Sequence, residues 1–303
     1  MSGTVVVVGG INLDTLARIE ADTVRGSSNP GRTVTAPGGV GRNVAENLSR
    51  LGSPVQLVGT VGRDHAGDLL LQALGRYDID TSRIIRHRTI RTGTYTAILS
   101  ATGDLDIGVA DMAATESIVP ADLGGSLLAD ASWLVLDGNL RIDTIAHGLR
   151  LAAAAGVPVA LDPVGVAKAA RLGPIPGVHT FTPNAAELAA WAGTDDPDAA
   201  IATAFAQDVE VLWLRAGAAG STLHRPDHDP VTIALEPAEV VDVTGAGDAM
   251  LAAYVHRLAA GDDVEDATWF ATAAAWLTVQ SSSAVREDLT EALVTKTLEE
   301  QRR

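Results

Sequence analysis

The sequence predicts an α/β protein whose central sheet is mostly parallel. Five short apolar runs have the length and composition of buried strands: residues 5–8, 54–58, 133–136, 157–161 and 211–214. Stretches with helical periodicity lie between them, and strands that alternate with helices are typical of a parallel sheet covered by helices. The 303 residues, 47% of them hydrophobic, suffice for a sizeable core.

Composition and charge exclude several classes of protein. The chain contains no cysteine, which rules out disulfides, thiolate metal sites and a cysteine nucleophile and agrees with a cytoplasmic enzyme. Its formal net charge is −16, from 22 Lys and Arg against 38 Asp and Glu, without a large basic cluster, so we expect no nucleic-acid partner. No apolar run is long enough to span a membrane, and the apolar start lacks the basic segment of a secretion signal.

The first predicted strand ends in the sequence GGINLD, residues 9–14. The spacing of its glycines is not G-x-G-x-x-G, so the dinucleotide fingerprint is absent. Asp14 lies just past the carboxyl end of the strand, where open α/β sheets bind ligands, and a carboxylate there can hold two sugar hydroxyls. The alternative is that Asn12 and Asp14 only form a polar turn.

Two segments interrupt the alternation of strands and helices. Residues 15–35 are polar and contain Ser28 and Asn29, while residues 86–112 have the pattern of short alternating strands. We expect both segments to form a small β lid that excludes water from a site beside the main sheet. The chain has no internal repeat, low-complexity tract or long linker, so we expect a single domain over residues 1–303 with the lid within it.

Three glycines cluster at the start of the next predicted helix: Gly38, Gly39 and Gly41. The helix has an apolar stripe formed by Val40, Val44, Leu48 and Leu51 and ends at Gly52. Backbone without side chains can approach a ligand closely. Asn43 falls on the first turn, where its amide can both donate to and accept from a hydroxyl or a base edge. The alternative, helix capping with close packing, explains Gly52 well but the three clustered glycines poorly.

Two further segments have the pattern of ligand-binding turns. In TPNAAEL, Asn184 and Glu187 lie on one face of a first helical turn and can hold a phosphate and hydrated Mg²⁺, but the same spacing fits a capping box equally well. After the strand VLWLR, residues 216–221 (AGAAGS) form a small-residue turn. A nucleotide can lie against such a turn, or the turn can simply close a hairpin.

The most informative segment is DVTGAGDAM, residues 242–250. Gly245 and Gly247, with Ala246 between them, let an anion approach the backbone. The apolar residues that follow recur at helical spacing: Met250, Leu251, Tyr254, Val255 and Leu258. The segment therefore begins a helix whose free N–H groups attract anions. Asp248 in its first turn can accept the proton of an attacking hydroxyl, as phosphoryl transfer requires. A tight turn with an acid that favours the helix dipole is the alternative.

The order of these segments resembles the ribokinase (PfkB) family of carbohydrate and nucleoside kinases. The matching elements are GG…D, GGxGxN, P-N-x-x-E, a strand with a Gly-rich turn, and D-x-T-G-A-G-D, which together cover the chain from about Val5 to the helix after Asp248. The resemblance implies a ribokinase-like three-layer sandwich with a mostly parallel central sheet and a small β lid. It also implies a phosphotransferase that uses ATP and Mg²⁺ and has an alcohol group as acceptor.

The resemblance gives each candidate residue a role. It implies that Asp248 is the catalytic base and that the anion hole comprises Gly245, Ala246 and Gly247. The candidate acceptor-binding residues are Asn12, Asp14, Ser28, Asn29, Gly38, Gly39, Gly41, Asn43 and Asn139. The candidate ATP-binding residues are Asn184, Arg215, Gly217 and Gly220. The candidate metal ligands are Glu187, for Mg²⁺ through water, and Asp242 with Thr244, for a monovalent cation such as K⁺.

Within the family, the resemblance is greatest to the pseudouridine kinases, through the sequence SNPGR at residues 28–32, residues 37–52 and TGAGDAM. Asn139 stands where sugar kinases of the family often carry an acidic residue, whereas Arg215 replaces a residue that is more often small or uncharged. We therefore expect ATP-dependent phosphorylation of the 5′-hydroxyl of pseudouridine. The alternatives are a kinase for another nucleoside or a furanose such as ribose, and a non-catalytic ligand-binding relative. Exposed lid edges favour a homodimer.

Overall fold

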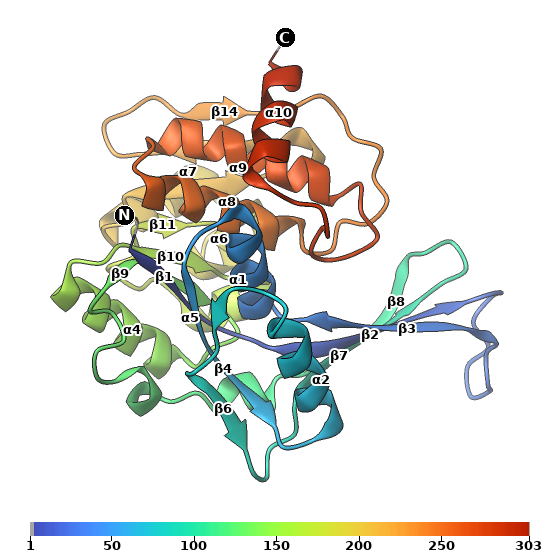
Figure 1. The fold of residues 1–303 in the computed structure, drawn as a ribbon. Helices are drawn as coiled ribbons and strands as arrows, with labels where there is room; N and C mark the ends of the chain where they lie inside the picture. The colour runs from blue at the N-terminus through green and yellow to red at the C-terminus, as the bar shows by residue number, and fades with distance from the viewer. Residues whose placement is uncertain (1–2, 303) are drawn as a thin grey trace.

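The computed structural model describes residues 3–302, which form three layers with a ten-stranded sheet in the middle (Figure 1). In β1 (Thr4–Val8), Val5 and Val7 pack against the helices on one face of the sheet, while Val6 and Val8 pack against those on the other. Side chains alternate across a strand, so an unbroken run of valines is buried on both faces. The expected ribokinase-like sandwich is confirmed. Residues 1, 2 and 303 of the predicted domain lie outside the described residues.

The main sheet has the strand order β14-β13-β12-β11-β10-β9-β1-β4-β5, and β6 also pairs with β4. Neighbouring strands are parallel from β12 to β5, and only the β12-β13-β14 end is antiparallel. After β1 its strands are β4 (Val55–Gly62), β5 (Ile79–Asp80), β6 (Ile84–His87), β9 (Ala131–Asp137), β10 (Val159–Asp162), β11 (Thr180–Phe181), β12 (Val211–Arg215), β13 (Ser221–His224) and β14 (Val231–Ile233).

Helices cover both faces of this sheet. One face carries α1 (Val40–Leu51), α2 (His65–Leu74), α8 (Ala246–Ala260), α9 (Val264–Thr278) and α10 (Glu291–Gln301). The other carries α4 (Ile142–Ala155), α5 (Val166–Leu172), α6 (Ala185–Ala192) and α7 (Pro197–Ala206). Two short helices, α3 (Ala113–Glu116) and η1 (Pro120–Leu123), precede β9.

The helix patterns read from the sequence are present in α1 and α8. In α1, Val44, Leu48 and Leu51 are buried, and Gly52 ends the helix with a φ of 95°, which favours glycine. In α8, the apolar stripe that begins at Met250 is buried against the sheet and α9. The stripes fix both helices to the sheet, and their first turns are therefore held in defined positions.

A separate four-stranded sheet, the lid, projects from the side of the main body (Figure 1). Its order is β3-β2-β7-β8, from β2 (Asn12–Ile19), β3 (Gly31–Gly38), β7 (Gly93–Leu99) and β8 (Leu105–Asp111). The expected small sheet is confirmed, but its extent differs. Arg86 and His87 pair with β4 in the main sheet, and the lid begins at Asn12 rather than near Thr15. Asn12 and Asp14 therefore lie on a lid strand, directly after the turn that follows β1.

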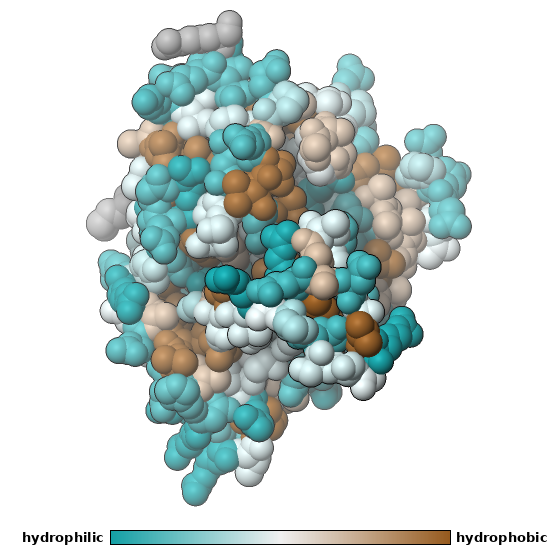
Figure 2. Space-filling model, turned by 90° about the vertical axis from the view of Figure 1, so that its right-hand side faces the viewer, coloured by the Kyte–Doolittle hydropathy of each residue, from teal (hydrophilic) through white to brown (hydrophobic). Residues whose placement is uncertain are grey.

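Figure 2 views the molecule from the side of the lid and shows its hydrophobic surface as several separate patches. Within the lid, β8 is an edge strand, and the side chains of Ile107 and Val109 are 51% and 59% exposed. Over residues 3–302, no helix combines the length and the apolar character needed to cross a bilayer.

Candidate active site

The candidate site lies at the carboxyl ends of the parallel strands. Gly9 and Gly10 follow β1, whereas β9 ends in Asp137, β10 in Asp162 and β12 in Arg215. Because these strands are parallel, their carboxyl ends meet at one edge of the sheet, where open α/β sheets bind ligands. The first turns of α1 and α8 lie at the same edge, because the N–H of Arg42 donates to the carbonyl oxygen of Gly10 and Asn43 donates to Asp248.

Asp137 joins the turns that follow β1 and β9. Its Oδ2 accepts a hydrogen bond from the N–H of Gly10, and its Oδ1 accepts one from the N–H of Asn139, both at 2.7 Å. A Cβ atom on Gly9 would collide with this carboxylate, so only glycine fits there. Burial raises the pKa of Asp137. We did not predict this residue from the sequence, although an aspartate that closes an apolar strand is a recognisable signal.

Three buried amide or carboxylate oxygens at this edge have no hydrogen-bond partner among the described residues: Asn12 Oδ1, Asp14 Oδ1 and Asn139 Oδ1. An unpaired buried polar atom costs about 1–3 kcal/mol, so such atoms mark places where a ligand can supply the partner. Burial raises the pKa of Asp14 to about 6, against the opposing charge of Arg42. A Cβ atom on Gly38 would collide with the Asp14 carboxylate, so Gly38 makes room for it.

Gly39 and Gly41 bring the start of α1 against the turn after β1. Gly39 has a φ of 93°, and a Cβ atom on it would lie 2.5 Å from the carbonyl oxygen of Gly10. A Cβ atom on Gly41 would lie 2.7 Å from the Cα of Gly9. Close packing of backbone on backbone therefore explains two of the three clustered glycines, contrary to the sequence-based expectation. Contact of these glycines with a ligand stays a prediction.

The start of α8 offers free backbone amides. Gly245 caps the helix with a φ of 78°, and a Cβ atom there would collide with the carbonyl oxygen of Ala284, so conformation and space both require glycine. Within residues 3–302, no group accepts a hydrogen bond from the N–H of Gly247 or Asp248. The N–H of Ala246 instead donates to a preceding carbonyl oxygen at 3.3 Å. Two free amides at the start of a long helix form an anion site.

Asp248 lies beside these amides, in the first turn of α8. Its side chain is partly buried, and Oδ2 accepts a hydrogen bond from Asn43 Nδ2 at 2.7 Å. Burial raises the pKa of Asp248 to about 7; the bond from Asn43 opposes this, the charges of Asp162 and Asp137 add to it, and that of Arg215 opposes it. A carboxyl group with a pKa near neutrality can serve as a general base near pH 7.

The side chain of Arg215 lies between two buried carboxylates. Its Nη1 is 3.2 Å from Asp162 Oδ2, and its Nη2 donates to Glu187 Oε2 at 3.1 Å. Burial by itself lowers the pKa of Arg215, but both carboxylates act against it and the pKa lies above its usual value. A Cβ atom on Gly247 would lie 2.7 Å from Nη1. Arg215 therefore places a fixed positive charge against the first turn of α8.

Asn184 and Glu187 form a capping box at the start of α6. The N–H of Glu187 donates to Asn184 Oδ1 at 2.9 Å, and the N–H of Asn184 donates to Glu187 Oε2 at 2.8 Å. The capping alternative is therefore confirmed. Glu187 Oε1 takes no part in these bonds, and a carboxylate oxygen can hold a water molecule of the hydration shell of Mg²⁺. No cluster of three or more potential metal-ligating side chains occurs among residues 3–302. Mg²⁺ held by Glu187 through water stays a prediction.

The small-residue turn after β12 contains the short helix η2 (Gly217–Ala219) and joins two antiparallel strands. The turn therefore closes a hairpin, which is one of the two alternatives that the sequence left open. Gly217 and Gly220 have φ values of 57° and 88°, and a Cβ atom on Gly220 would collide with the backbone of Ile233. Binding of a nucleotide to this turn stays a prediction, and so does a monovalent cation at Asp242, whose Oδ1 accepts from the N–H of Thr244 at 2.8 Å.

Two expected acceptor-binding residues lie apart from the others. Ser28 and Asn29 belong to the turn between β2 and β3, at the end of the lid far from Asn12 (Figure 1). Eight residues of β2 extend over about 25 Å. Asn29 uses its amide to close that turn, because it donates to the carbonyl oxygen of Val24 and accepts from its N–H. The structure therefore does not bring Ser28 and Asn29 to the carboxyl edge.

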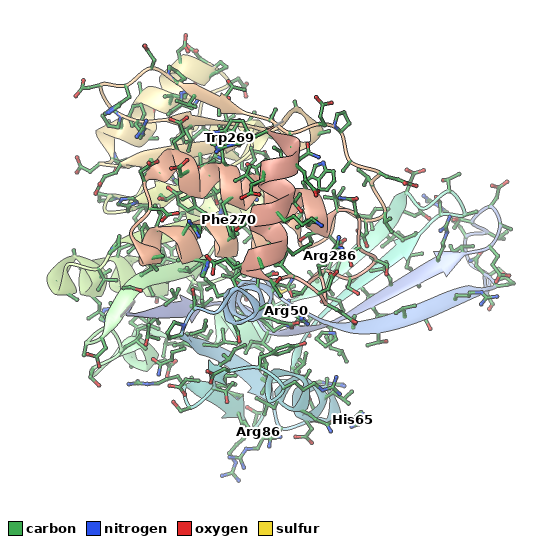
Figure 3. The ribbon with its side chains drawn as sticks, turned by 45° about the horizontal axis from the view of Figure 1, so that its top comes forward. Arg50, His65, Arg86, Trp269, Phe270 and Arg286 are labelled. Atoms are coloured by element: carbon green, nitrogen blue, oxygen red, sulfur yellow. The ribbon has the colours of Figure 1, made fainter. Side chains whose placement is uncertain are left out.

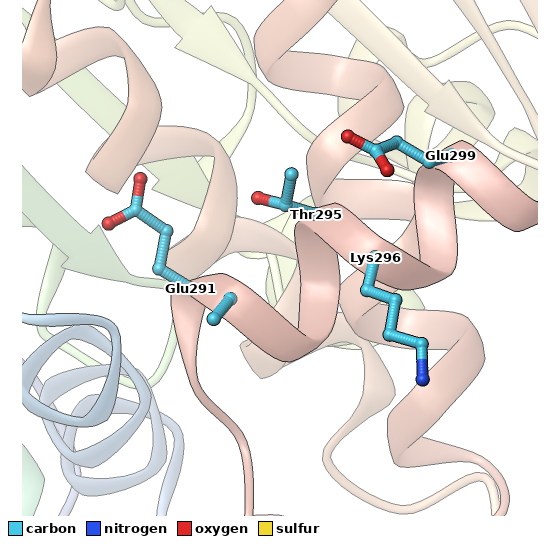
Figure 4. A pocket seen from close by; sticks show the side chains of 5 residues that line it. Glu291, Thr295, Lys296 and Glu299 are labelled. Carbon is cyan, nitrogen blue, oxygen red and sulfur yellow. The ribbon is translucent and has the colours of Figure 1, made fainter.

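A surface hollow elsewhere lies outside this site. The side chains labelled in Figure 4, Glu291, Thr295, Lys296 and Glu299, all come from α10. The residues that line it include none of the candidate residues above. We therefore treat the carboxyl edge as the candidate active site.

Comparison with known proteins identifies the family. Residues 3–291 match the pfkB family of carbohydrate kinases. The chain belongs to this family. An uncharacterised sugar kinase of Escherichia coli (strain K12) is 30% identical over 286 residues, which are 92% of this chain and 78% of the relative. The pseudouridine kinase of the same strain is 30% identical over 256 residues, which are 82% of this chain and 81% of the relative.

A solved structure of a ribokinase shares the fold. Arabidopsis thaliana ribokinase complexed with ribose and ATP has a TM-score of 0.87 and 27% sequence identity, and the match covers 98% of this chain and 99% of that one. As a member of the pfkB family, the protein is a sugar or nucleoside kinase, that is, a phosphotransferase with an alcohol group as acceptor. Kinases of this family use ATP, and their substrates are small molecules.

Proposed function

We propose that this pfkB kinase transfers the γ-phosphoryl group of ATP to the 5′-hydroxyl of pseudouridine and so produces pseudouridine 5′-phosphate and ADP. The observation that carries the proposal is the position of Asp248. Its carboxylate accepts a hydrogen bond from Asn43 Nδ2 at 2.7 Å, and the N–H groups of Gly247 and Asp248 in the same turn have no acceptor among the described residues, so a base and an anion site meet in one helical turn. Phosphoryl transfer needs this pair, because its chemistry is otherwise positioning and charge stabilisation.

In the proposed reaction, Asp248 takes the proton from the 5′-hydroxyl as its oxygen attacks the γ-phosphorus. The bond between the γ-phosphorus and the bridging oxygen breaks, and ADP leaves with the electron pair. In the anion hole assigned to Gly245, Ala246 and Gly247, the free N–H groups of Gly247 and Asp248 hold the charge that spreads over the phosphoryl oxygens. Arg215 adds a positive charge at the same place, because its Nη1 would lie 2.7 Å from a Cβ atom built on Gly247.

The nucleotide side of the proposed site is built from β11, β12 and α6. We assign ATP binding to Asn184, Arg215 and the turn that contains Gly217 and Gly220. Mg²⁺, held by Glu187 through water, would neutralise charge on the phosphates of ATP. Asp242 and Thr244 would help bind K⁺ behind the anion hole.

Pseudouridine fits the acceptor side because of its hydrogen-bond donors. Its base has two N–H groups, whereas that of uridine has one. Two amide oxygens, Asn12 Oδ1 and Asn139 Oδ1, are buried without a partner among the described residues, and Asp14 can hold two ribose hydroxyls. A site with unpaired buried acceptors rejects a ligand that lacks the matching donors. The 30% identity to the E. coli pseudouridine kinase supports the same substrate.

The second candidate is a kinase for another nucleoside or for ribose. The likeness to ribokinase complexed with ribose and ATP, over 98% of this chain, favours it. Asn139 argues for the nucleoside, because by family resemblance sugar kinases often have an acidic residue there. A non-catalytic relative is disfavoured, since Asp248 and the glycines beside it are all present.

A panel of acceptors tests the proposal. Pseudouridine, uridine, adenosine, ribose and fructose would be assayed separately for ADP release with ATP and Mg²⁺. We expect pseudouridine to have the highest kcat/KM. If ribose had a higher kcat/KM than pseudouridine, the substrate assignment would be wrong while the kinase assignment stood.

We also propose a homodimer that forms through the lid. The edge strand β8 presents Ile107 and Val109 on one face with more than half of each side chain exposed, and such edges tend to pair. Light scattering coupled to gel filtration would give the mass of the wild type and of Val109→Lys. We expect the wild type to be a dimer and Val109→Lys to be a monomer. A monomeric wild type would contradict the proposal.

Location in the cytoplasm stays a prediction.

A further inference from the structure

We propose that Arg42 is a positioning residue for the carboxylate of Asp248 and acts through the side-chain amide of Asn43. The inference rests on the proposed function, because it concerns the base of that reaction. Arg42 carries no role in the assignments above. It belongs to α1, whereas Asp248 belongs to α8, so the link joins two helices that converge at the active site.

A chain of short hydrogen bonds connects the two residues. Arg42 Nη1 donates to Asn43 Oδ1 at 2.6 Å, and Asn43 Nδ2 donates to Asp248 Oδ2 at 2.7 Å. At the other end, Arg42 Nη2 lies 3.1 Å from Glu46 Oε2. The three residues of α1 in this chain are buried, with 5–6% of their surface exposed. Water therefore competes little with the contacts among Arg42, Asn43 and Glu46, whereas the bond to Asp248 is partly buried.

The chemistry of the chain fixes the direction of the Asn43 amide. Arginine has only donors, so the Asn43 oxygen must face Arg42 and the nitrogen must face Asp248. Without Arg42, nothing on that side would prevent the amide from turning its oxygen toward the carboxylate, where it would repel it. Glu46 holds the guanidinium in place. Arg42 thus keeps a donor aimed at the base, which favours the ionised carboxylate and fixes its position.

Charged groups from several elements face Asp248, and each affects the ionisation of its carboxyl group. Asp137 and Asp162 at the ends of β9 and β10 disfavour its ionisation, while Arg215 from β12 favours it. Arg42 from α1 also lies within range of its charge, and within range of the Asp14 carboxylate on β2, whose raised pKa it opposes. Arg215 faces the phosphate side and is already paired with Asp162 and Glu187. Arg42 is therefore the positive charge that reaches Asp248 from the acceptor side.

Replacing Arg42 by Met tests the role. The base must be ionised to act, so activity rises with pH through its pKa, and loss of a neighbouring positive charge raises that pKa. Only the Asn43 amide and its two hydrogen bonds separate the charges of Arg42 and Asp248. At that range, the acidic limb of the profile of kcat against pH should move up by about one pH unit. We expect kcat to fall by about 10- to 100-fold, with an unchanged KM for ATP.

Arg50→Met is the matched control. Arg50, labelled in Figure 3, also belongs to α1 and also binds Glu46, at 2.9 Å, but its other side-chain partners are Tyr77 and a backbone carbonyl. We expect the control to keep kcat within about twofold and the limb in place. A wild-type profile in Arg42→Met, or the same shift in both variants, would overturn the inference.

Arg42→Lys covers the case in which Arg42→Met does not fold. Lysine keeps the buried charge but lacks the planar fork that reaches Glu46 and Asn43 together. In Arg42→Lys, the acidic limb of the pH profile should stay in place while kcat falls. A wild-type kcat in this variant would overturn the inference.

A second readout does not depend on turnover. The Asp248 carboxyl carbon would be titrated by NMR in ¹³C-aspartate-labelled protein, and its signal assigned by its absence in Asp248→Asn. Its pKa should be higher in Arg42→Met than in the wild type, and equal values would overturn the inference. If the wild type phosphorylated no acceptor, the proposed function would fail, but this titration would still decide the role of Arg42.

Discussion

Replacing Asp248 by Asn should stabilise the fold while it removes turnover. Burial raises the pKa of Asp248 from 3.8 to about 7, so the folded protein prefers the protonated carboxyl group. The stability that this preference contributes is fully present below pH 3.8 and is lost as the pH rises to about 7. Three pKa units at about 1.4 kcal/mol each set an upper limit of about 4 kcal/mol on the free energy of unfolding that the uncharged variant can gain.

The expected gain at pH 8 is smaller than this limit. The side chain is partly exposed, so water screens the charge, and we expect about 2 kcal/mol, or about 4 °C in melting temperature. Asparagine has nearly the same shape and no charge, and its oxygen can still accept the bond from Asn43. The variant should therefore melt above the wild type at pH 8, with a smaller difference at pH 5 because the wild-type carboxyl group is then mostly protonated.

The assay is thermal unfolding without nucleotide at pH 5, 6, 7 and 8. Asp288→Asn is the control for the substitution itself. A hydrogen bond from Arg286 holds the pKa of Asp288 below its usual value, so its charge stabilises the fold and that variant should not gain stability at pH 8. Melting of Asp248→Asn at or below the wild-type temperature at pH 8, or a difference in melting temperature that did not shrink toward pH 5, would contradict this prediction.

Three further substitutions test the geometry of the site. Gly38→Ala puts a methyl group where the Asp14 carboxylate lies, so the KM for the acceptor should rise about tenfold or more while the Kd of ATP, measured by calorimetry, stays unchanged. Gly245→Ala places a side chain at a φ of 78° against Ala284, so both the melting temperature and kcat should fall. Asn139→Asp keeps the acceptor oxygen but introduces the acidic group that by family resemblance sugar kinases often have there, so the ratio of kcat/KM for pseudouridine to that for ribose should fall by about tenfold.

Gly52→Ala is the control for both glycine variants. Gly52 also has a positive φ, of 95°, but no atom lies within 4 Å of a Cβ atom placed there. It should lose about 1 kcal/mol of stability and keep its KM and kcat. An unchanged acceptor KM in Gly38→Ala, or wild-type melting in Gly245→Ala, would show that the start of α1 or α8 can move aside. An unchanged substrate ratio in Asn139→Asp would remove Asn139 from the acceptor site.

The elements that the sequence predicted well are those with a local signal. Unbroken apolar runs identified β1 and β9, and the stripes that begin at Val40 and Met250 identified α1 and α8. Glycines with positive φ, such as Gly245, mark a backbone conformation that few other residues adopt. Asp248 could be assigned to a first helical turn because the assignment needs only two local signals, the glycines before it and the apolar stripe after it.

The contacts that could not be predicted join residues far apart in the chain. The bond from Asn43 to Asp248 spans 205 positions, and that from Gly10 to Asp137 spans 127. Motif spacing carries no information about such pairs, because they depend on strand order. The placement of Asn29 failed for a related reason: a polar side chain in a lid segment can bind a ligand or close its own turn, and here it closes the turn.

The pairing of Arg215 shows a third limit. Its departure from the family pattern was visible in the sequence, but its partners were not. Asp162 ends a strand that precedes it by more than fifty residues, and Glu187 had been assigned only to a cap or to Mg²⁺. A buried arginine needs carboxylates near it, yet the sequence alone does not say which ones.

The most direct test of the account is phosphoryl transfer from ATP to pseudouridine by the wild type and by Asp248→Asn. Mass spectrometry would identify the product, and ³¹P NMR would show whether the phosphorus couples to the 5′ hydrogens. We expect pseudouridine 5′-phosphate and ADP in equal amounts from the wild type, with turnover at least about 100-fold lower in Asp248→Asn although ATP still binds. Near wild-type turnover in Asp248→Asn, or a wild type that phosphorylates none of the sugars or nucleosides offered, would contradict it.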